Sequence, residues 1–242
     1  AACPEIKFTS NSGPINISCV TDTCIRLKAR LPNIRQTANS QSSYIVNAVP
    51  FAEAQPFNIP GANAIFVNED DKYSNIITLP FTFCYFGNNY NSVVIGANGT
   101  ITFNTNMANR PSSYEQCSYN NTPFTLPRID PNHPGNTIFA ALHDIDPSIN
   151  NSTNKRIEWS ITGQAPCRKM IINWVEISQF SCNTSRSTFQ CVLYENTNVI
   201  DVFIRQKPVC DIWNCGLATI GIQNINATVA ITPPNRNATS FN

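Results

Sequence analysis

Hydrophobic and polar residues alternate most regularly over Leu79–Phe103, which reads LPFTFCYFGNNYNSVVIGANGTITF. Phe81, Phe83 and Tyr85 fall on one side of an extended segment, because successive side chains of a β-strand point to opposite faces. An Asn98-Gly99 pair then separates two β-prone runs, and this dipeptide is the strongest short-range signal for a hairpin closed by a type I′ turn. The stretch therefore predicts the central hairpin of an all-β domain.

Short alternating runs recur along the rest of the chain at intervals of about 10–15 residues, which is typical of a sandwich or a barrel. We expect strands at residues 25–31, 44–49, 64–67, 76–79, 138–142, 156–161, 169–177, 187–194, 199–205, 218–223 and 228–231. Residues 169–177 are apolar on both faces, as in a central strand that is covered on both sides. Ile157, Trp159 and Ile161 should face the core, and Glu158 should face solvent. The predicted fold is all-β, an antiparallel, jelly-roll-like β-sandwich with long Pro- and Asn-rich loops and disulfide staples.

The 242 residues fit one large β-domain, and only 13% of them are charged, with a formal net charge of +1. This balance argues against a nucleic-acid-binding domain, which needs a basic excess, and against charge-driven disorder. No run approaches the roughly 18 apolar residues that span a bilayer, so the sequence predicts no membrane-spanning segment. Sequons are frequent, and in an Asn-rich chain they do not by themselves establish glycosylation: Asn16, Asn98, Asn120, Asn150, Asn151, Asn183, Asn226 and Asn237.

Ten cysteines are the sharpest compositional signal: Cys3, Cys19, Cys24, Cys84, Cys117, Cys167, Cys182, Cys191, Cys210 and Cys215. Their number is even, no Cys-x-x-Cys pair occurs and only two histidines are present, so disulfides are favoured over a zinc site. Disulfides indicate an oxidising, extracellular compartment, and we expect a signal peptide to have been removed from a secreted protein. We expect a local Cys3–Cys19 disulfide in an irregular segment over residues 1–23, and a single sandwich domain over residues 24–242.

The most polar constellation is His143-Asp144-Ile145-Asp146, in which the two carboxylates share a face if the segment is extended. If the fold brings Asp70 and Asp71 close to Asp144 and Asp146, the four side chains offer the oxygen ligands that calcium prefers. The alternative is structural, because an aspartate before proline commonly caps backbone amides in a turn. No other cofactor is expected.

Residues 104–136 form the longest region without a regular pattern, and a loop of this length is usually functional or held in place by a staple. Cys117 lies in it, so a disulfide is expected to pin it. Tyr114, Tyr119 and Phe124 either stack on sugar rings or cap the end of the sandwich, and we favour capping. The basic face of residues 25–31 contacts an anionic polysaccharide or only keeps the strand soluble, and we favour solubility.

Catalytic patterns are poorly supported. A serine hydrolase would have to use His133 or His143, the sequence has no Gly-x-Ser-x-Gly elbow, and His133 between prolines is expected at the surface. A glycosidase needs two carboxylates at a set separation, which no pair in the sequence identifies. We therefore expect a protein that is not an enzyme and does not bind nucleic acid.

A family resemblance rests on motifs that occur in a fixed order: the stretch at 79–103, IFAALHDIDPS, GQAPCRKMIINWVEISQFSC, VLYENTNVIDVFIRQKPVC, ATIGIQN and ITPPNRN. Together they resemble the N-terminal domain of large secreted surface proteins of gliding and related Bacteroidota, which are adhesin-like cargo of the type IX secretion system. The chain is also similar, more weakly, to the nidogen-type extracellular domain, through the pattern F-x-F-x-x-G-x-x-Y-x-x-V…NG-x-I-x-F.

The resemblance implies a disulfide-bearing β-domain at the cell surface, here expected to be a fragment of a larger protein, with adhesion to a glycan or protein partner as its role. Alternatives from other classes are a carbohydrate-binding module and a structural subunit or cap of an extracellular filament. Cys191 and Cys215 depart from the family pattern, so we predict that they pair with each other. A Cys182–Cys210 disulfide is also expected, because the hairpin between these residues would bring both to the same end of a sheet.

Overall fold

The computed structural model describes residues 44–54, 56–57, 61–65 and 69–242. Three predictions concern residues outside this part of the chain: the irregular segment 1–23, the Cys3–Cys19 disulfide and the strand at residues 25–31. The strand expected at residues 44–49 is not one, because these mostly exposed residues pair with no neighbour in either sheet.

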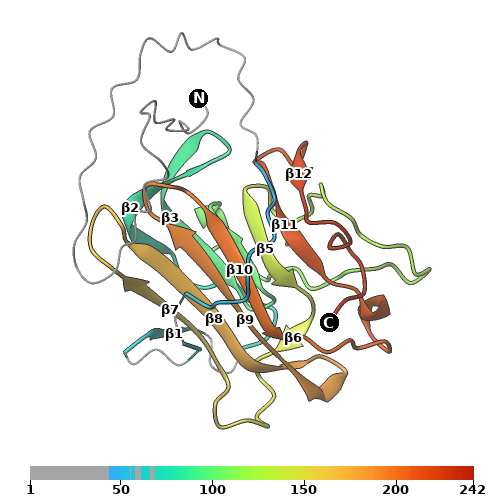
Figure 1. The fold of residues 1–242 in the computed structure, drawn as a ribbon. Coiled ribbons are helices and arrows are strands. Elements are labelled where there is room, and N and C mark those ends of the chain that lie inside the picture. Colours follow the sequence, from blue (N-terminus) through green and yellow to red (C-terminus); the bar gives the residue numbers. More distant parts are fainter. Residues whose placement is uncertain (1–43, 55, 58–60, 66–68) are drawn as a thin grey trace.

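Two antiparallel sheets form the domain (Figure 1). Sheet 1 has the order β1 (Asn63–Ile65), β7 (Arg156–Thr162), β8 (Lys169–Gln179), β9 (Cys182–Tyr194) and β10 (Ile200–Gln206), with β6 (Ile145–Asp146) paired to one end of β8. Sheet 2 has the order β12 (Ala230–Ile231), β11 (Thr219–Gln223), β5 (Thr137–Leu142), β4 (Thr100–Thr102), β3 (Asn88–Gly96) and β2 (Ile77–Tyr85). Helical structure in the described residues is limited to the short 3₁₀ turns η1 (Thr105–Met107) and η2 (Asn214–Gly216).

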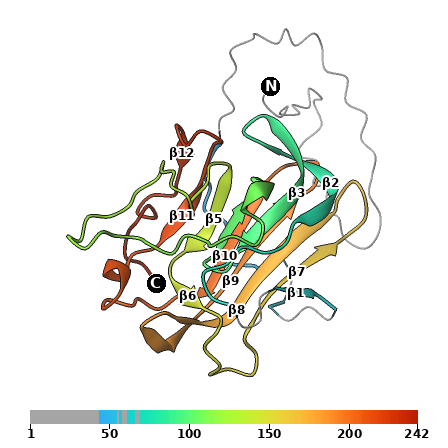
Figure 2. The ribbon, with the colours of Figure 1, turned by 180° about the vertical axis from the view of Figure 1, so that it is seen from behind.

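The strands connect as two meanders. β7 to β10 follow one another across sheet 1, and β2 to β5 follow one another across sheet 2, as the view from behind shows (Figure 2). The antiparallel sandwich is as predicted, and its strand order is sequential rather than the interleaved order of a jelly roll. Short turns explain the β2–β3, β3–β4 and β8–β9 neighbours, because they keep consecutive strands adjacent. β4 and β5 also pair, although the long loop over residues 103–136 lies between them.

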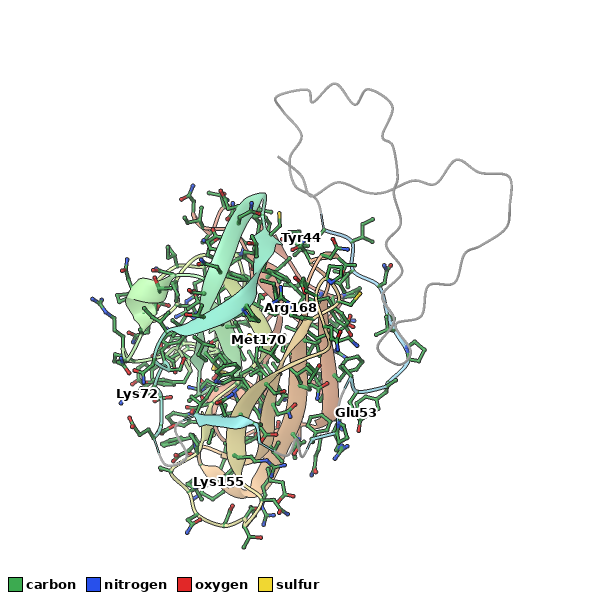
Figure 3. All side chains as sticks on the ribbon, turned by 90° about the vertical axis from the view of Figure 1, so that its left-hand side faces the viewer. Tyr44, Glu53, Lys72, Lys155, Arg168 and Met170 are labelled. Atoms are coloured by element: carbon green, nitrogen blue, oxygen red, sulfur yellow. A yellow bond between two sulfur atoms is a disulfide. The ribbon has the colours of Figure 1, made fainter. Side chains whose placement is uncertain are left out.

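The hydrophobic core lies between the two sheets. Along β2 the buried residues alternate with exposed ones, as the sequence predicted: Ile77, Leu79, Phe81, Phe83 and Tyr85. Sheet 1 contributes Met170, which lies in the interior (Figure 3), and Trp174 stacked on Phe189 with ring centroids 4.8 Å apart. Each large apolar side chain buried in this way contributes about 1.5–3 kcal/mol to stability.

The hairpin turns differ from the prediction in one respect. The type I′ geometry closes the β2–β3 hairpin, where Phe86 and Gly87 both have positive φ, +45° and +78°. At Asn98-Gly99 only the glycine is left-handed, at +83°, and Gly96 pairs with Thr100, so the β3–β4 connection is a three-residue loop. The predicted type I′ turn at Asn98-Gly99 is therefore wrong, although the chain does reverse there.

A covering segment, residues 51–54, 56 and 57, crosses the outer face of sheet 1. Ala54 donates its backbone N–H to Gln190 Oε1 at 3.0 Å, and Figure 3 shows Glu53 on this outer side. Beneath the segment, Gln190 donates to Asn173 at 2.8 Å, and Asn173 donates to Glu158 at 3.0 Å. The expectation that Glu158 faces solvent is wrong for this reason, whereas the double coverage of β8 is confirmed.

Disulfides link distant segments. Cys182 bonds to Cys210, as predicted, and Cys117 bonds to Cys215 and so pins the long loop to the η2 region. The predicted Cys191–Cys215 disulfide is wrong, because Cys191 lies on the core face of β9, fully buried, where burial raises the pKa of its thiol. None of the helices in the described residues is long and apolar enough to cross a membrane.

Candidate functional site

Three carboxylates converge at one end of the sandwich. Asp70 and Asp71 lie in the loop before β2, and Asp144 lies between β5 and β6. One oxygen from each of the three lies within 4.8 Å of the others. The fold thus joins the two acidic pairs that the sequence singled out. Asp146 is buried nearby but accepts a hydrogen bond from the Ser148 N–H at 2.7 Å, which is the turn-capping role that we gave as the alternative.

Asn98 holds the group together from the β3–β4 loop. It is fully buried and donates from Nδ2 to Asp71 Oδ1 at 2.7 Å. Its Oδ1 accepts the Ile145 N–H at 2.9 Å, and Ile145 follows Asp144 directly. A single side chain therefore fixes the loop before β2 against the segment after β5. Sequence analysis assigned Asn98 to a turn and missed this role, because nothing local to an Asn-Gly dipeptide indicates burial.

Asp144 has an asymmetric environment. Trp213 donates its indole N–H to Oδ2 at 2.7 Å, while Oδ1 is buried and has no hydrogen-bond partner in the described part of the chain. The residue as a whole is only 6% exposed. A void of about 10 Å³, roughly the space of one water, borders Asp144 and is lined also by His143, Lys207 and Trp213. Trp213 could not have been assigned to this site from sequence, because it is 69 residues distant from Asp144.

The carboxylates perturb one another. Burial, followed by repulsion from Asp71 and Asp146, raises the pKa of Asp70 to about 7. Burial also raises the pKa of Asp144 to about 8, against the hydrogen bond from Trp213, which lowers it, and with smaller repulsions from Asp71, Asp70 and Asp146. The pKa of Asp71 is raised mainly by burial, against the hydrogen bond from Asn98. A bound cation would relieve this repulsion between partly buried carboxylates and would favour their charged form.

A second feature is a polar groove of about 720 Å³ on the outer face of sheet 1, next to the covering segment. Its walls carry the guanidinium groups of Arg156, Arg186 and Arg205, together with the carboxylate of Glu176. Each arginine has an acidic partner: Arg156 with Glu158 at 3.0 Å, Arg186 with Glu176 at 3.5 Å, and Arg205 with Glu53 at 2.5 Å. Nε of Arg186 is buried without a partner among the described residues.

The loop aromatics do not gather into one platform. Tyr119 is fully exposed, Tyr114 is half-buried, and Phe124 lies under the Arg128 guanidinium at 4.2 Å. No ring contact joins any two of these three in the described structure. Burial raises the pKa of Tyr114, and the charges of Glu115, Asp71 and Asp144 add to the effect, which indicates that Tyr114 lies near the acidic group. Phe124 therefore packs against Arg128, and of the three rings only that of Tyr119 is fully exposed to solvent.

Both histidines are interior residues. His143 contacts Ser187 Oγ through Nε2 at 2.7 Å and the Ala141 carbonyl through Nδ1 at 2.7 Å, and all of these groups are buried. His133 contacts Ser113 Oγ at 2.9 Å and stacks on Phe139, so its predicted surface position is wrong. Burial lowers the pKa of His143 to about 3 and that of His133 to about 4.

The family model described as NIDO related matches residues 50–242, which is most of the chain. No curated protein and no solved structure matches it.

Proposed function

Since this chain belongs to the NIDO-related family, we propose that it is a non-catalytic extracellular domain that mediates attachment at a cell surface. Two disulfides between described residues support an oxidising, extracellular compartment, because such bonds rarely persist in the cytosol. The weaker nidogen-type similarity noted in the sequence agrees with this family.

The environment of the histidines supports a non-catalytic role. His143 and Ser187 have the spacing of a nucleophile and its base, but a nucleophile must reach its substrate. Ser187 is fully buried, and His143 is oriented by a backbone carbonyl rather than a carboxylate. Burial keeps the imidazole neutral, so the pair is better explained as a satisfied polar contact within the core.

The groove on sheet 1 is the contact surface that we favour, and the observation that carries this choice is the three guanidinium groups on its walls. Guanidinium groups bind carboxylates and sulfates through paired hydrogen bonds. A polar groove of this size suits an extended, anionic polar ligand, and we propose an acidic glycan.

The test is binding of the full chain to an array of acidic and neutral glycans. We expect retention on acidic glycans, and a loss of roughly 10- to 150-fold in the Arg186→Gln and Arg205→Gln variants, since a charge-assisted hydrogen bond is worth about 1.5–3 kcal/mol. Arg168→Gln is the matched control, because Arg168 pairs with Glu195 beyond the groove lining. Equal loss in the control, or turnover of a glycan by the purified chain, would contradict the proposal.

A second candidate contact is Tyr119, whose ring is fully exposed on the disulfide-pinned loop. An exposed ring can stack on a sugar, as in a carbohydrate-binding module, and this role would require no charge on the ligand. Tyr119→Ala should then weaken binding to neutral glycans, while the arginine variants leave it unchanged.

The finer assignment, to adhesin-like cargo of the type IX secretion system, is part of the proposal and rests on the ordered sequence motifs. It predicts that the full-length gene product carries a C-terminal sorting domain. A full-length product without one would remove this assignment and leave the NIDO-related family membership intact.

A further inference from the structure

We propose that Asp70, Asp71 and Asp144 bind a calcium ion that ties the loop before β2 to the segment between β5 and β6. This site is separate from the groove on sheet 1 and does not depend on what the groove binds.

The spacing of the oxygens fits such an ion. Calcium is bound by oxygens at 2.3–2.6 Å, so two ligands on opposite sides of one ion lie up to about 5 Å apart. The three carboxylates each place an oxygen within 4.8 Å of the others. The group contains no sulfur or nitrogen ligand, which favours a hard cation over zinc.

In each of the three carboxylates, one oxygen accepts a hydrogen bond from the protein. Asp70 Oδ1 accepts the Asp71 N–H at 2.9 Å, Asp71 Oδ1 accepts Asn98 Nδ2, and Asp144 Oδ2 accepts the Trp213 indole. One oxygen of each is thus used to orient the side chain, and the second remains for a ligand. Preorganised carboxylates of this kind lower the ordering cost of binding an ion.

The buried oxygen of Asp144 is the independent indication that something is bound. Asp144 is more than nine-tenths buried, and its Oδ1 has no hydrogen-bond partner in the described residues. A buried polar atom is ordinarily paired, and an unpaired one calls for a specific explanation such as an ion.

Terbium luminescence provides a direct test, because terbium replaces calcium in oxygen sites and is excited by a nearby indole. Trp213 donates to Asp144 at 2.7 Å and would lie next to the ion. We expect tryptophan excitation of the full chain to give terbium emission that calcium displaces. We also expect calcium at about 100 times its Kd to raise the Tm by roughly 5–10 °C above the value in chelator.

The informative variant is the double substitution Asp70→Asn and Asp71→Asn, which keeps both hydrogen-bond acceptors and removes two charges. It should abolish terbium emission and the calcium-induced shift, while its Tm in chelator equals or exceeds that of the wild type because repulsion is relieved. Asp201→Asn on β10 is the control and should behave as the wild type. Calcium that neither displaces terbium nor raises the Tm of the wild type, or a double variant that keeps both responses, would overturn the proposal.

Discussion

Trp174 on β8 donates its indole N–H to the backbone carbonyl of Gly96 at the end of β3, across 3.2 Å. The bond joins sheet 1 to sheet 2 inside the core. Gly96 is required there, because a Cβ at this position would lie 2.2 Å from Thr100 Oγ1 and 3.0 Å from the Tyr73 ring. The contact connects the strand with apolar residues on both faces to the loop that contains Asn98.

Trp174→Phe should lower the free energy of unfolding by roughly 2–3 kcal/mol, since it removes the inter-sheet donor and leaves a cavity. The measurement is the denaturant midpoint at constant m. Trp159→Phe is the matched control, because Trp159 is only partly buried at the core margin, and a loss below about 1.5 kcal/mol is expected. Equal losses in the two variants would mean that the bond to Gly96 adds nothing.

The two disulfides between described residues should differ in strength. Cys117 and Cys215 are 98 residues apart in sequence, and Cys182 and Cys210 are 28 apart. On the chain-entropy model these loops correspond to about 4.7 and 3.6 kcal/mol of stabilisation. Replacing the first pair with serine should therefore cost about 1 kcal/mol more than replacing the second, measured by urea unfolding of the oxidised proteins. The reverse order would show that native-state contacts, rather than loop length, determine the effect.

The sheets were predictable because their signal is local. Alternation along β2 has a period of two, so burial of one face follows directly from the order of residues such as Phe81 and Phe83. Residues 169–177 were correctly expected to be covered on both faces, but the covering segment itself was not identified. That segment is recognised only from contacts such as Ala54 to Gln190, which are 136 residues apart. Glu158 was misplaced for the same reason.

The site was predictable only in part. Asp70, Asp71 and Asp144 were grouped because calcium prefers oxygen ligands, and the fold does bring them together. Asn98 and Trp213 orient these carboxylates, but no sequence pattern indicated that they would contact them. The disulfide of Cys215 was assigned to the wrong partner because pairing depends on where strands lie in space, and Cys191 faces the core. The alternation of polar and apolar residues thus did not predict which residues distant in sequence would contact one another.

Burial should determine which sequons carry a glycan when the chain is secreted from eukaryotic cells. Glycans attach to the side-chain nitrogen of asparagine, and Nδ2 of Asn98 is buried and bonded to Asp71 and the Ser113 carbonyl. We expect no glycan at Asn98 in the folded, secreted fraction, as measured by glycopeptide mass spectrometry. Asn120 and Asn226 are exposed and serve as the comparison. A glycan on Asn98 in folded protein would contradict its placement at the acidic group.

His133 should make stability depend on pH. Burial lowers its pKa to about 4 from 6.5, so as pH falls from 6.5 the unfolded chain takes up a proton first, and stability is lost until about pH 4. Relative to His133→Asn, the wild type should lose roughly 3 kcal/mol across this window. The difference between the two proteins is the quantity to measure, since aspartates with raised pKa values act in the opposite direction in both. Ser113→Ala removes the same hydrogen bond without a titrating group, so its loss should be constant with pH. Parallel stability curves for the wild type and His133→Asn would show that the imidazole does not titrate as its burial requires.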